Sequence, residues 1–219
     1  MQIYRLPADQ DLTVQKLDYF LNKHMNEVNI RLIKLRDAYE TRYEIGRLAP
    51  KPNWKPDNRI AVNFAKYIVD TMNGFFIGIP VKTMSDNERV AEYINFLDSY
   101  NDQDDNNAEL SKLCDIYGRA YEMYYVDEFG KIGITYVSPL ESFMIYDDSV
   151  LERERYFVRT YVDSKGVLHG SVSDAMTVRH FIKKGALHFT DEKVHGFSGV
   201  PATEYRENEE RIGIFEPVL

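Results

Sequence analysis

The chain has 219 residues, of which 44% are hydrophobic and 28% are charged, values close to those of ordinary globular proteins. Disorder throughout and a membrane-helix bundle are therefore excluded as defaults, and a chain of this length is predicted to bury a substantial core. The 27 basic and 35 acidic residues give a net charge of −8, which argues against a surface built to neutralise many DNA phosphates.

The cysteine content and the hydropathy pattern favour the cytoplasm. The single cysteine, Cys114, cannot form a disulfide within the chain, and no secretory leader pattern opens the sequence. Cys114 lies among leucine and isoleucine, which predicts a buried small hydrophobe rather than a nucleophile. The most apolar window contains Lys66 and Asp70, so no membrane span is expected.

The first predicted element is a helix from residue 13 to about residue 45, in which apolar residues recur every three or four positions. Thr13 is expected to cap it and Gly46 to end it. One extended helix and two helices with a bend near residues 26–29 both fit the pattern. Acidic residues lie between its basic ones, which predicts a solvated face rather than a DNA-binding patch. The basic residues are Arg31, Lys34, Arg36, Arg42 and Arg47, and the acidic ones are Asp37, Glu40 and Glu44.

An irregular connector is predicted for residues 49–57, which contain three prolines. The only tryptophan of the chain, Trp54, lies inside this connector. A tryptophan in such a loop can mark an interaction site, but packing of the loop onto its own domain is the favoured interpretation.

Residues 58–83 predict an amphipathic helix that leads into an extended segment. Apolar residues at every fourth position define one helical face, which is expected to hold the domain together. Residues 75–81 contain aromatic and β-branched residues punctuated by glycine and proline, which favours a strand. The face consists of Ile60, Phe64, Ile68 and Met72.

Two further helices are predicted before residue 118. Ser85 or Asp86 is expected to cap the first, and the second is expected to run over residues 107–117 and to end at Gly118. The acidic break between them, NDQDDNN, has oxygen-bearing side chains at alternate positions, as a calcium loop does. We reject that interpretation, because Asn107 and Leu113 stand where such a loop requires glycine and glutamate. The alternate positions are Asp102, Asp104 and Asn106.

From residue 119 onward the hydrophobic period changes to that of strands. Residues 119–137 predict a hairpin with its turn at 127–130. Further strands are predicted at 142–146, 155–162, after residue 166, at 176–182 and at 186–190. Helices followed by strands indicate an α+β fold with long amino-terminal helices, a helical segment and a mainly antiparallel sheet.

The common catalytic and nucleotide-binding motifs are absent, and we predict no catalytic residue, no cofactor site and no metal site. The five histidines fall on different predicted strands and turns, which favours ordinary structural roles. The adjacent carboxylates Asp147 and Asp148 predict a turn rather than a cation site. The sixteen tyrosines predict sheet packing or a protein interface. Stacking on nucleic-acid bases is disfavoured, because the basic residues that would bind the phosphate backbone are not interleaved with Tyr117, Tyr121, Tyr124 and Tyr125.

Three segments together resemble the siphovirus-type portal proteins of tailed double-stranded DNA bacteriophages. They are NRIAVNFAKYIVDTMNGFFIGIPVKT (58–83), LCDIYGRAYEMYYVDEFGKIGITYVSPLESFMIYDDS (113–149) and ERIGIFEP (210–217). Their order and separations match the family. The resemblance covers residues 58–219 and, more weakly, the helical amino-terminal part.

This resemblance implies a structural subunit of a ring, usually a dodecamer, at the capsid vertex through which DNA is packaged and ejected. It implies no enzymatic activity and no cofactor. The implied partners are other copies of the chain, capsid and scaffolding proteins, terminase, head-completion proteins, and double-stranded DNA that passes without tight binding. The implied location is the virion, and the host cytoplasm during assembly; no membrane is involved.

The resemblance also implies a domain division. Residues 1–57 are expected to form a helical arm with a Pro-rich connector, and residues 58–219 an α+β domain like the portal wing. The sequence stops where the stem of such a protein is expected to begin, before the clip and crown, and the segment 207–219 is interpreted as truncated and exposed.

Two other interpretations remain open. The chain could be a different structural or adaptor protein of the virion. It could also be a metal-dependent nuclease whose site is built from acidic residues in two segments. These residues are Asp102, Asp104, Asp105, Asp147 and Asp148.

Overall fold

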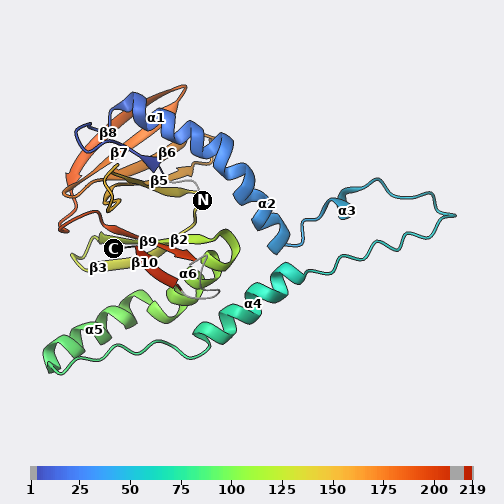
Figure 1. Cartoon of the computed structure of the whole chain (residues 1–219), viewed down its shortest axis with the longest axis horizontal. Coiled ribbons are helices and arrows are strands. Elements are labelled where there is room, and N and C mark those ends of the chain that lie inside the picture. Colours follow the sequence, from blue (N-terminus) through green and yellow to red (C-terminus); the bar gives the residue numbers. More distant parts are fainter. Residues whose placement is uncertain (1–3, 208–214, 219) are drawn as a thin grey trace.

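Two stacked sheets form the body of the protein, and helices cover the outer face of each (Figure 1). The structure, a computed structural model, describes residues 4–207 and 215–218. Its helices are α1 (Val14–Lys23), the π-helical turn η1 (His24–Val28), α2 (Asn29–Tyr39), α3 (Glu44–Arg47), α4 (Phe64–Ile77), α5 (Glu88–Asn101) and α6 (Gln103–Tyr117). Its strands are β1 (Tyr4–Arg5), β2 (Arg119–Val126), β3 (Ile132–Val137), β4 (Ser142–Tyr146), β5 (Glu154–Val162), β6 (Leu168–Ser173), β7 (Thr177–Lys184), β8 (Ala186–Val194), β9 (Ala202–Glu207) and β10 (Phe215–Val218). The predicted α+β class is confirmed.

The large sheet has the strand order β1-β4-β5-β6-β7-β8, and the small sheet has the order β10-β9-β2-β3. All neighbouring strands are antiparallel except β1, which runs parallel to β4. The predicted hairpin is confirmed as β2 and β3, and the predicted strand at 142–146 coincides with β4. Period-two patterning therefore located the sheets correctly.

Strand β4 is buried on both faces, because the pleat sends its side chains alternately to two different cores. Phe143 and Ile145 pack against α1, whereas Met144 and Tyr146 pack against the small sheet. In β5 the same alternation sends Tyr156 and Val158 towards α1 and Phe157 towards the small sheet. Strands β4 and β5 therefore contribute side chains to the cores on both faces of the large sheet.

Helix α1 belongs to the same core as the large sheet. Leu17 and Leu21 are fully buried against strands of that sheet, and the side chain of Thr13 caps the helix by accepting a hydrogen bond from Lys16 N (3.3 Å). This cap was predicted. Residues 4–21 therefore share a core with β4 to β8, while the division of the chain at residue 57 stays a prediction.

The first helix ends earlier than predicted. Helical residues run without interruption from 14 to 39, and the π-helical turn η1 occupies the region where a bend was considered. Thr41 then adopts a left-handed φ of 61°, which a continuing helix does not allow. The prediction that the helix reaches residue 45 was therefore wrong, and Gly46 lies within the short helix α3 rather than at the end of a long one.

The predicted strand at residues 75–81 is absent. Helix α4 continues to Ile77 and thus includes Phe75 and Phe76. The predicted packing face is also wrong, because Ile60, Phe64 and Ile68 are exposed. A different stripe faces α6, and Val69 at its centre is 8% exposed. The local β propensity of residues 75–77 had no neighbouring strand to satisfy it, and helical hydrogen bonding prevailed.

The acidic break between α5 and α6 is shorter than predicted. Asp102 alone separates the two helices, with a left-handed φ of 50°, and α6 begins at Gln103 rather than at residue 107. Asn87, rather than Ser85 or Asp86, caps α5 by accepting from Arg89 N and Val90 N. Gly118 ends α6 with a φ of 78°, as predicted.

Two asparagines of this break protect the edge of the small sheet. Asn101 Oδ1 accepts from Ile134 N (2.8 Å), and Asn101 Nδ2 donates to Ile132 O (3.2 Å). Asn106 Nδ2 donates to Ile134 O (3.1 Å). Because β3 is the outermost strand, these amides take the place of a further strand and discourage pairing with another chain.

A buried carboxylate joins the two sheets. Glu204 of β9 is completely buried, and its oxygens lie 3.1 Å from Arg119 and 2.9 Å from Arg206. Tyr121 of β2 donates to it at 3.2 Å, and Tyr146 of β4 donates to it from the large sheet. Burial, together with the charge of Glu204, raises the pKa of both tyrosines well above its usual range. Both hydroxyls therefore stay protonated donors.

Replacing Glu204 with glutamine should lower the free energy of unfolding by about 3–5 kcal/mol, because both arginines would lose their buried counter-charge. Urea denaturation of the variant measures this loss. Glu192→Gln, on the exposed strand β8, is the control. Equal stability of the two variants would contradict the assigned role of Glu204.

Protonation of His24 should destabilise the fold. The ring is buried, Tyr4 Oη lies 2.9 Å from its Nδ1, and burial lowers its pKa from 6.5 to about 4. Because the folded pKa is the lower one, the stability is complete above pH 6.5 and is lost as pH falls towards 4, by roughly 3 kcal/mol. Denaturation at several pH values should show a smaller loss for His24→Gln than for the exposed control His188→Gln. An unchanged pH profile for His24→Gln would contradict this assignment.

Candidate functional site

The acidic residues considered for a nuclease lie in two different structural settings. Asp102, Asp104 and Asp105 lie at the junction of α5 and α6. Asp147 lies in the β4–β5 turn, where its Oδ1 accepts hydrogen bonds from Ser149 N, Ser149 Oγ and Arg153 N. These bonds lower the pKa of Asp147, the Ser149 hydroxyl most. The turn interpretation is confirmed, and within residues 4–207 no three His, Cys, Asp or Glu side chains are grouped to hold a metal ion.

Asp148 also has a structural partner. Its Oδ1 accepts a hydrogen bond from Ala8 N at 3.2 Å, so it joins the β4–β5 turn to the segment that follows β1. Both carboxylates of the pair therefore organise backbone, which is a common use of aspartate in turns.

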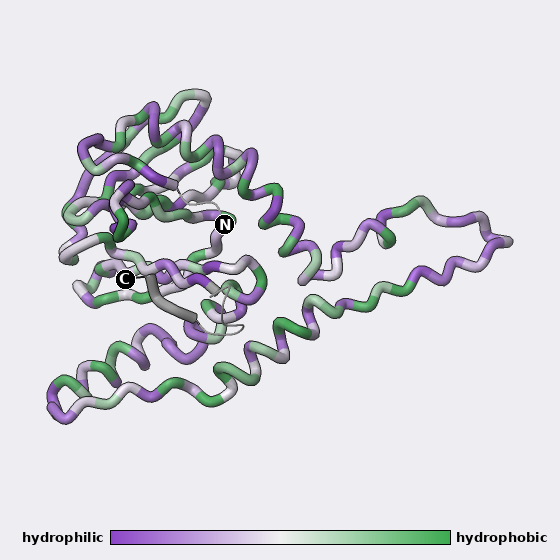
Figure 2. Tube along the Cα trace, viewed as in Figure 1, coloured by the Kyte–Doolittle hydropathy of each residue, from purple (hydrophilic) through white to green (hydrophobic). Residues whose placement is uncertain are grey.

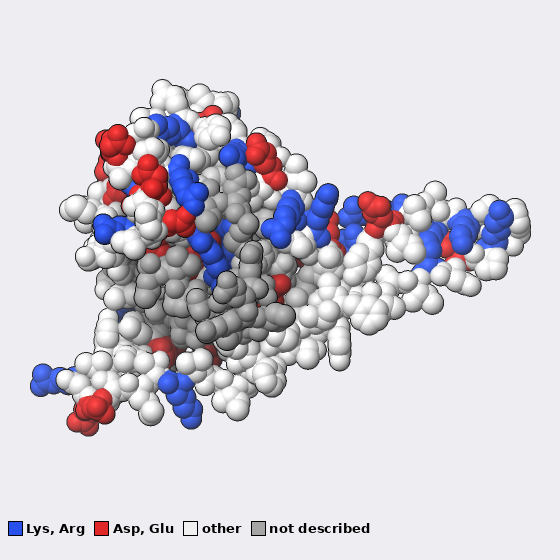
Figure 3. All heavy atoms as spheres, viewed as in Figure 1, with Lys and Arg blue, Asp and Glu red and all other residues white. Residues whose placement is uncertain are grey.

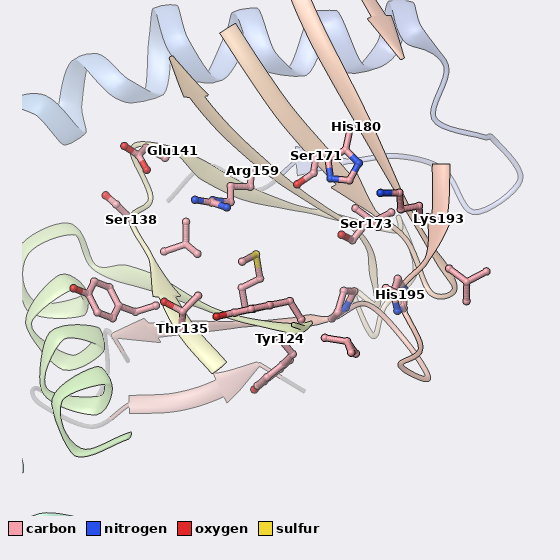
Figure 4. Close-up of a pocket in the computed structure, with 18 residues that line it drawn as sticks. Tyr124, Thr135, Ser138, Glu141, Arg159, Ser171, Ser173, His180, Lys193 and His195 are labelled. Carbon is pink, nitrogen blue, oxygen red and sulfur yellow. The ribbon is translucent and has the colours of Figure 1, made fainter. Parts of the chain in front are cut away.

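A cleft with a volume of about 700 Å³ lies between the two sheets. Figure 4 shows polar side chains from both sheets pointing into it, with Arg159, His180 and Lys193 on the large sheet and Tyr124 and Thr135 on the small one. The cleft thus combines two cations, several hydroxyls, two imidazoles and the carboxylate of Glu141.

The two imidazoles of this cleft have structural partners. His180 Nδ1 lies 3.0 Å from Asp191 Oδ1, close enough for an ion pair but without the geometry of a hydrogen bond. His195 Nε2 donates to Asp174 O (2.9 Å), and its Nδ1 accepts from Phe197 N (3.1 Å). Outside the cleft, His169 pairs with Asp163 (3.1 Å). The prediction of ordinary structural roles for the histidines is thus confirmed for these residues.

The tyrosines considered for base stacking belong largely to the sheet core. Tyr121 is fully buried and Tyr117 is 5% exposed, and Tyr124 donates to Glu122 Oε2 (2.7 Å) within the small sheet. Tyr125 is more exposed than these three. Sheet packing, one of the two predicted roles, is confirmed for Tyr121, which belongs to the core between the sheets, whereas Tyr117 is buried on helix α6.

The most unusual surface of the protein is an exposed apolar strip along α4, which we call the α4 apolar surface. Figure 2 shows hydrophobic positions recurring, between hydrophilic ones, along α4 and the segments on either side of it. Phe64 is 67% exposed, Ile68 is 58% exposed and Phe75 is 90% exposed. Soluble monomers rarely expose so many large apolar side chains along one segment. The strip consists of Ile60, Val62, Phe64, Ile68, Phe75 and Ile79.

Residues 44–62 project from the body as a long loop, which we call the arm (Figure 1). Asn63 closes its base: Nδ2 donates to Tyr39 O (2.7 Å) and Thr41 Oγ1 (2.6 Å), while Oδ1 accepts from Tyr43 Oη (3.1 Å). Farther along, Arg59 donates to Leu48 O (2.6 Å) and so joins the two sides of the arm. The arm is therefore held at its base and along its length.

Trp54 lies in the arm and is 76% exposed. Lys55 Nζ lies 4.6 Å from the centre of its ring, but the ring does not pack onto the body of the protein. The interpretation that this loop folds onto its own domain was therefore wrong. The predicted solvated face is confirmed for Arg31, Lys34, Arg42 and Arg47, which are exposed; Arg42, for example, lies 2.5 Å from Glu40 at the surface. Arg36 is half-buried and pairs with Asp37 (3.1 Å).

No helix of residues 4–207 is both long enough and apolar enough to cross a bilayer. The terminal segment interpreted as truncated and exposed falls mostly outside the described residues: 208–214 and 219 are not described, and of residues 215–218 only the strand β10 is. The third segment of the resemblance, 210–217, is subject to the same limit.

The part of the chain that is similar to known proteins includes the α4 apolar surface and the arm. The family model described as "Phage portal protein, SPP1 Gp6-like" matches residues 18–219, which include both features. The portal protein of Bacillus phage SPP1 is 31% identical over 114 residues, which make up 52% of this chain and 22% of that protein. The match thus spans less than a quarter of the relative. By its family match, the chain belongs to the SPP1 Gp6-like phage portal proteins.

Proposed function

We propose that this chain is part of a structural subunit of a bacteriophage portal ring, located at the capsid vertex through which DNA is packaged and ejected. The family match over residues 18–219 is the observation that carries this proposal. In it, the chain supplies scaffold and subunit contacts and performs no catalysis. Its location is the virion, and the host cytoplasm while the head assembles.

The exposed surfaces of the fold support an assembly role. The α4 apolar surface and the arm stand away from the two-sheet core, and α4 contributes only one buried residue, Val69, to the packed body. Exposed apolar strips of this kind are typical of surfaces that another protein covers. In a ring, each subunit would cover part of its neighbour in this way.

The remaining partners follow from the same role. We propose that the complete protein contacts capsid and scaffolding proteins at its rim and docks terminase and head-completion proteins. The net charge of −8 suits a conduit, because a surface that repels phosphates does not hold passing double-stranded DNA.

Assembly should depend on the exposed stripe of α4 and not on its buried stripe. We expect Ile68→Gln to change the stability of the chain by less than about 0.5 kcal/mol but to prevent ring formation. Val69→Ala, the matched control one residue away, should cost about 1 kcal/mol and leave rings intact. Negative-stain microscopy and native mass spectrometry of the protein measure assembly, and thermal unfolding measures stability. Particles without a central hole would favour a different virion or adaptor protein.

Binding to duplex DNA should be weak and should not show the steep salt dependence of a protein that contacts many phosphates. Fluorescence anisotropy with a labelled duplex at several salt concentrations measures this. Tight binding that salt abolishes would contradict the conduit role.

A further inference from the structure

We propose that the arm of one copy docks onto α4 and α6 of the next copy, with Trp54 seated in an apolar pocket of that neighbour. The occupant of the pocket is thus a second copy of this chain. This inference rests on the proposed function and specifies one contact that would link the subunits of the ring.

The arm presents an exposed aromatic side chain on a loop that is already held in one conformation. Trp54 and Lys55 form a stacked pair in the arm, and Trp54 is 76% exposed. Tryptophan is the residue type most enriched at the energetic centres of interfaces. Because Asn63 and Arg59 hold the arm in shape, little ordering entropy remains to be lost on docking.

A pocket suited to such a side chain lies at the far end of α4. It has a volume of about 310 Å³, and Phe76, Ile77, Val81 and Leu110 provide apolar walls. This volume can hold a large aromatic ring. An apolar recess of this kind on the surface of a subunit is the usual counterpart of an aromatic anchor.

A buried polar atom in the same pocket lacks a hydrogen-bond partner. Ser111 lines the pocket and is 4% exposed, and its Oγ makes no hydrogen bond within the described residues. Buried hydroxyls without a partner are rare in folded proteins. The oxygen has almost no exposed surface, so the Ser111 side chain must rotate towards the pocket before it can accept a hydrogen bond from the indole N–H of Trp54.

The two surfaces carry opposite charge. The arm has four basic residues and two acidic ones, a net charge of +2, and Figure 3 shows its lysine and arginine side chains along the projection. Helices α5 and α6 together have seven acidic and two basic residues, a net charge of −5. Asp104 lies one turn before the pocket residue Asn107 on α6. It is therefore placed to attract Lys55 when Trp54 is seated.

The arm and the pocket cannot meet within one copy. The arm leaves the body at the start of α4, whereas Phe76 and Ile77 of the pocket lie at its end, about 20 Å away along a helix of this length. Figure 1 shows the arm pointing away from that end. A contact between different surfaces of two copies is heterologous. Such contacts form a closed ring when the rotation that relates one copy to the next divides a full turn evenly.

Disulfide trapping tests this contact directly. We expect the protein with Asn53→Cys, which leaves the neighbouring Trp54 in place, and Asn107→Cys to form a ladder of covalent trimers and larger species on oxidation, because each copy would carry one cysteine on the arm and one at the pocket. Either substitution alone can form no species larger than a dimer at these positions, and Cys114 is buried. Negative-stain microscopy of the same samples reports ring formation separately. Rings without a ladder would overturn the proposed contact and leave the proposed function standing. A ladder without rings would support the proposed contact and count against the proposed function.

Substitutions test the chemistry of the contact. Trp54→Ala should weaken association between copies about tenfold, while Phe129→Ala, an exposed aromatic residue on the β2–β3 turn, should leave it unchanged. Lys55→Asp should weaken association, and Asp104→Lys in the same chain should restore it. Unchanged association for Trp54→Ala would overturn the contact. A loss of duplex-DNA binding by Lys55→Asp with association intact would also overturn it, and would assign the arm to nucleic acid.

Discussion

The stacking of the two sheets depends on the buried carboxylate of Glu204. A charge with no exposure is costly to bury, and it is tolerated only where paired charges and hydrogen bonds surround it. Two arginines and Tyr121 supply these from the small sheet, while Tyr146 reaches across from β4 of the large sheet. A sliding of one sheet over the other would break these contacts together, so the network selects one arrangement of the layers.

The positions of the outer helices follow from that arrangement. Helix α6 packs its Leu110 and Cys114 on the outer face of the small sheet, and α4 in turn packs Val69 towards α6. Helix α2 also contacts α4, where Tyr39 donates to Asp70 (2.8 Å), while Phe64 and Ile68 are exposed. Asn63, which caps α4, also closes the base of the arm. One residue thus sets both the start of the apolar helix and the exit of the arm.

Features with local causes could be predicted from the sequence. The strands from β2 to β8 were located to within a few residues, because alternation and turn residues are short-range signals. The Glu204 network could not be predicted, since Tyr121 and Tyr146 are 83 and 58 residues away from Glu204 along the chain. The edge protection by Asn101 and Asn106 was hidden for the same reason, although an asparagine-rich break between two helices followed by a hairpin is a signal that could have suggested it.

The error at α4 has a different cause. Amphipathic periodicity shows which side chains avoid water, but it does not show which molecule covers them. In α4, Val69 is covered by its own chain, whereas Phe64 and Ile68 on neighbouring sides of the helix are not. A helix that is apolar on most of its sides is normally buried on most of them. The described chain covers one stripe only, so the misassigned face marks an apolar surface that this fold leaves open to another part of the protein or to another molecule.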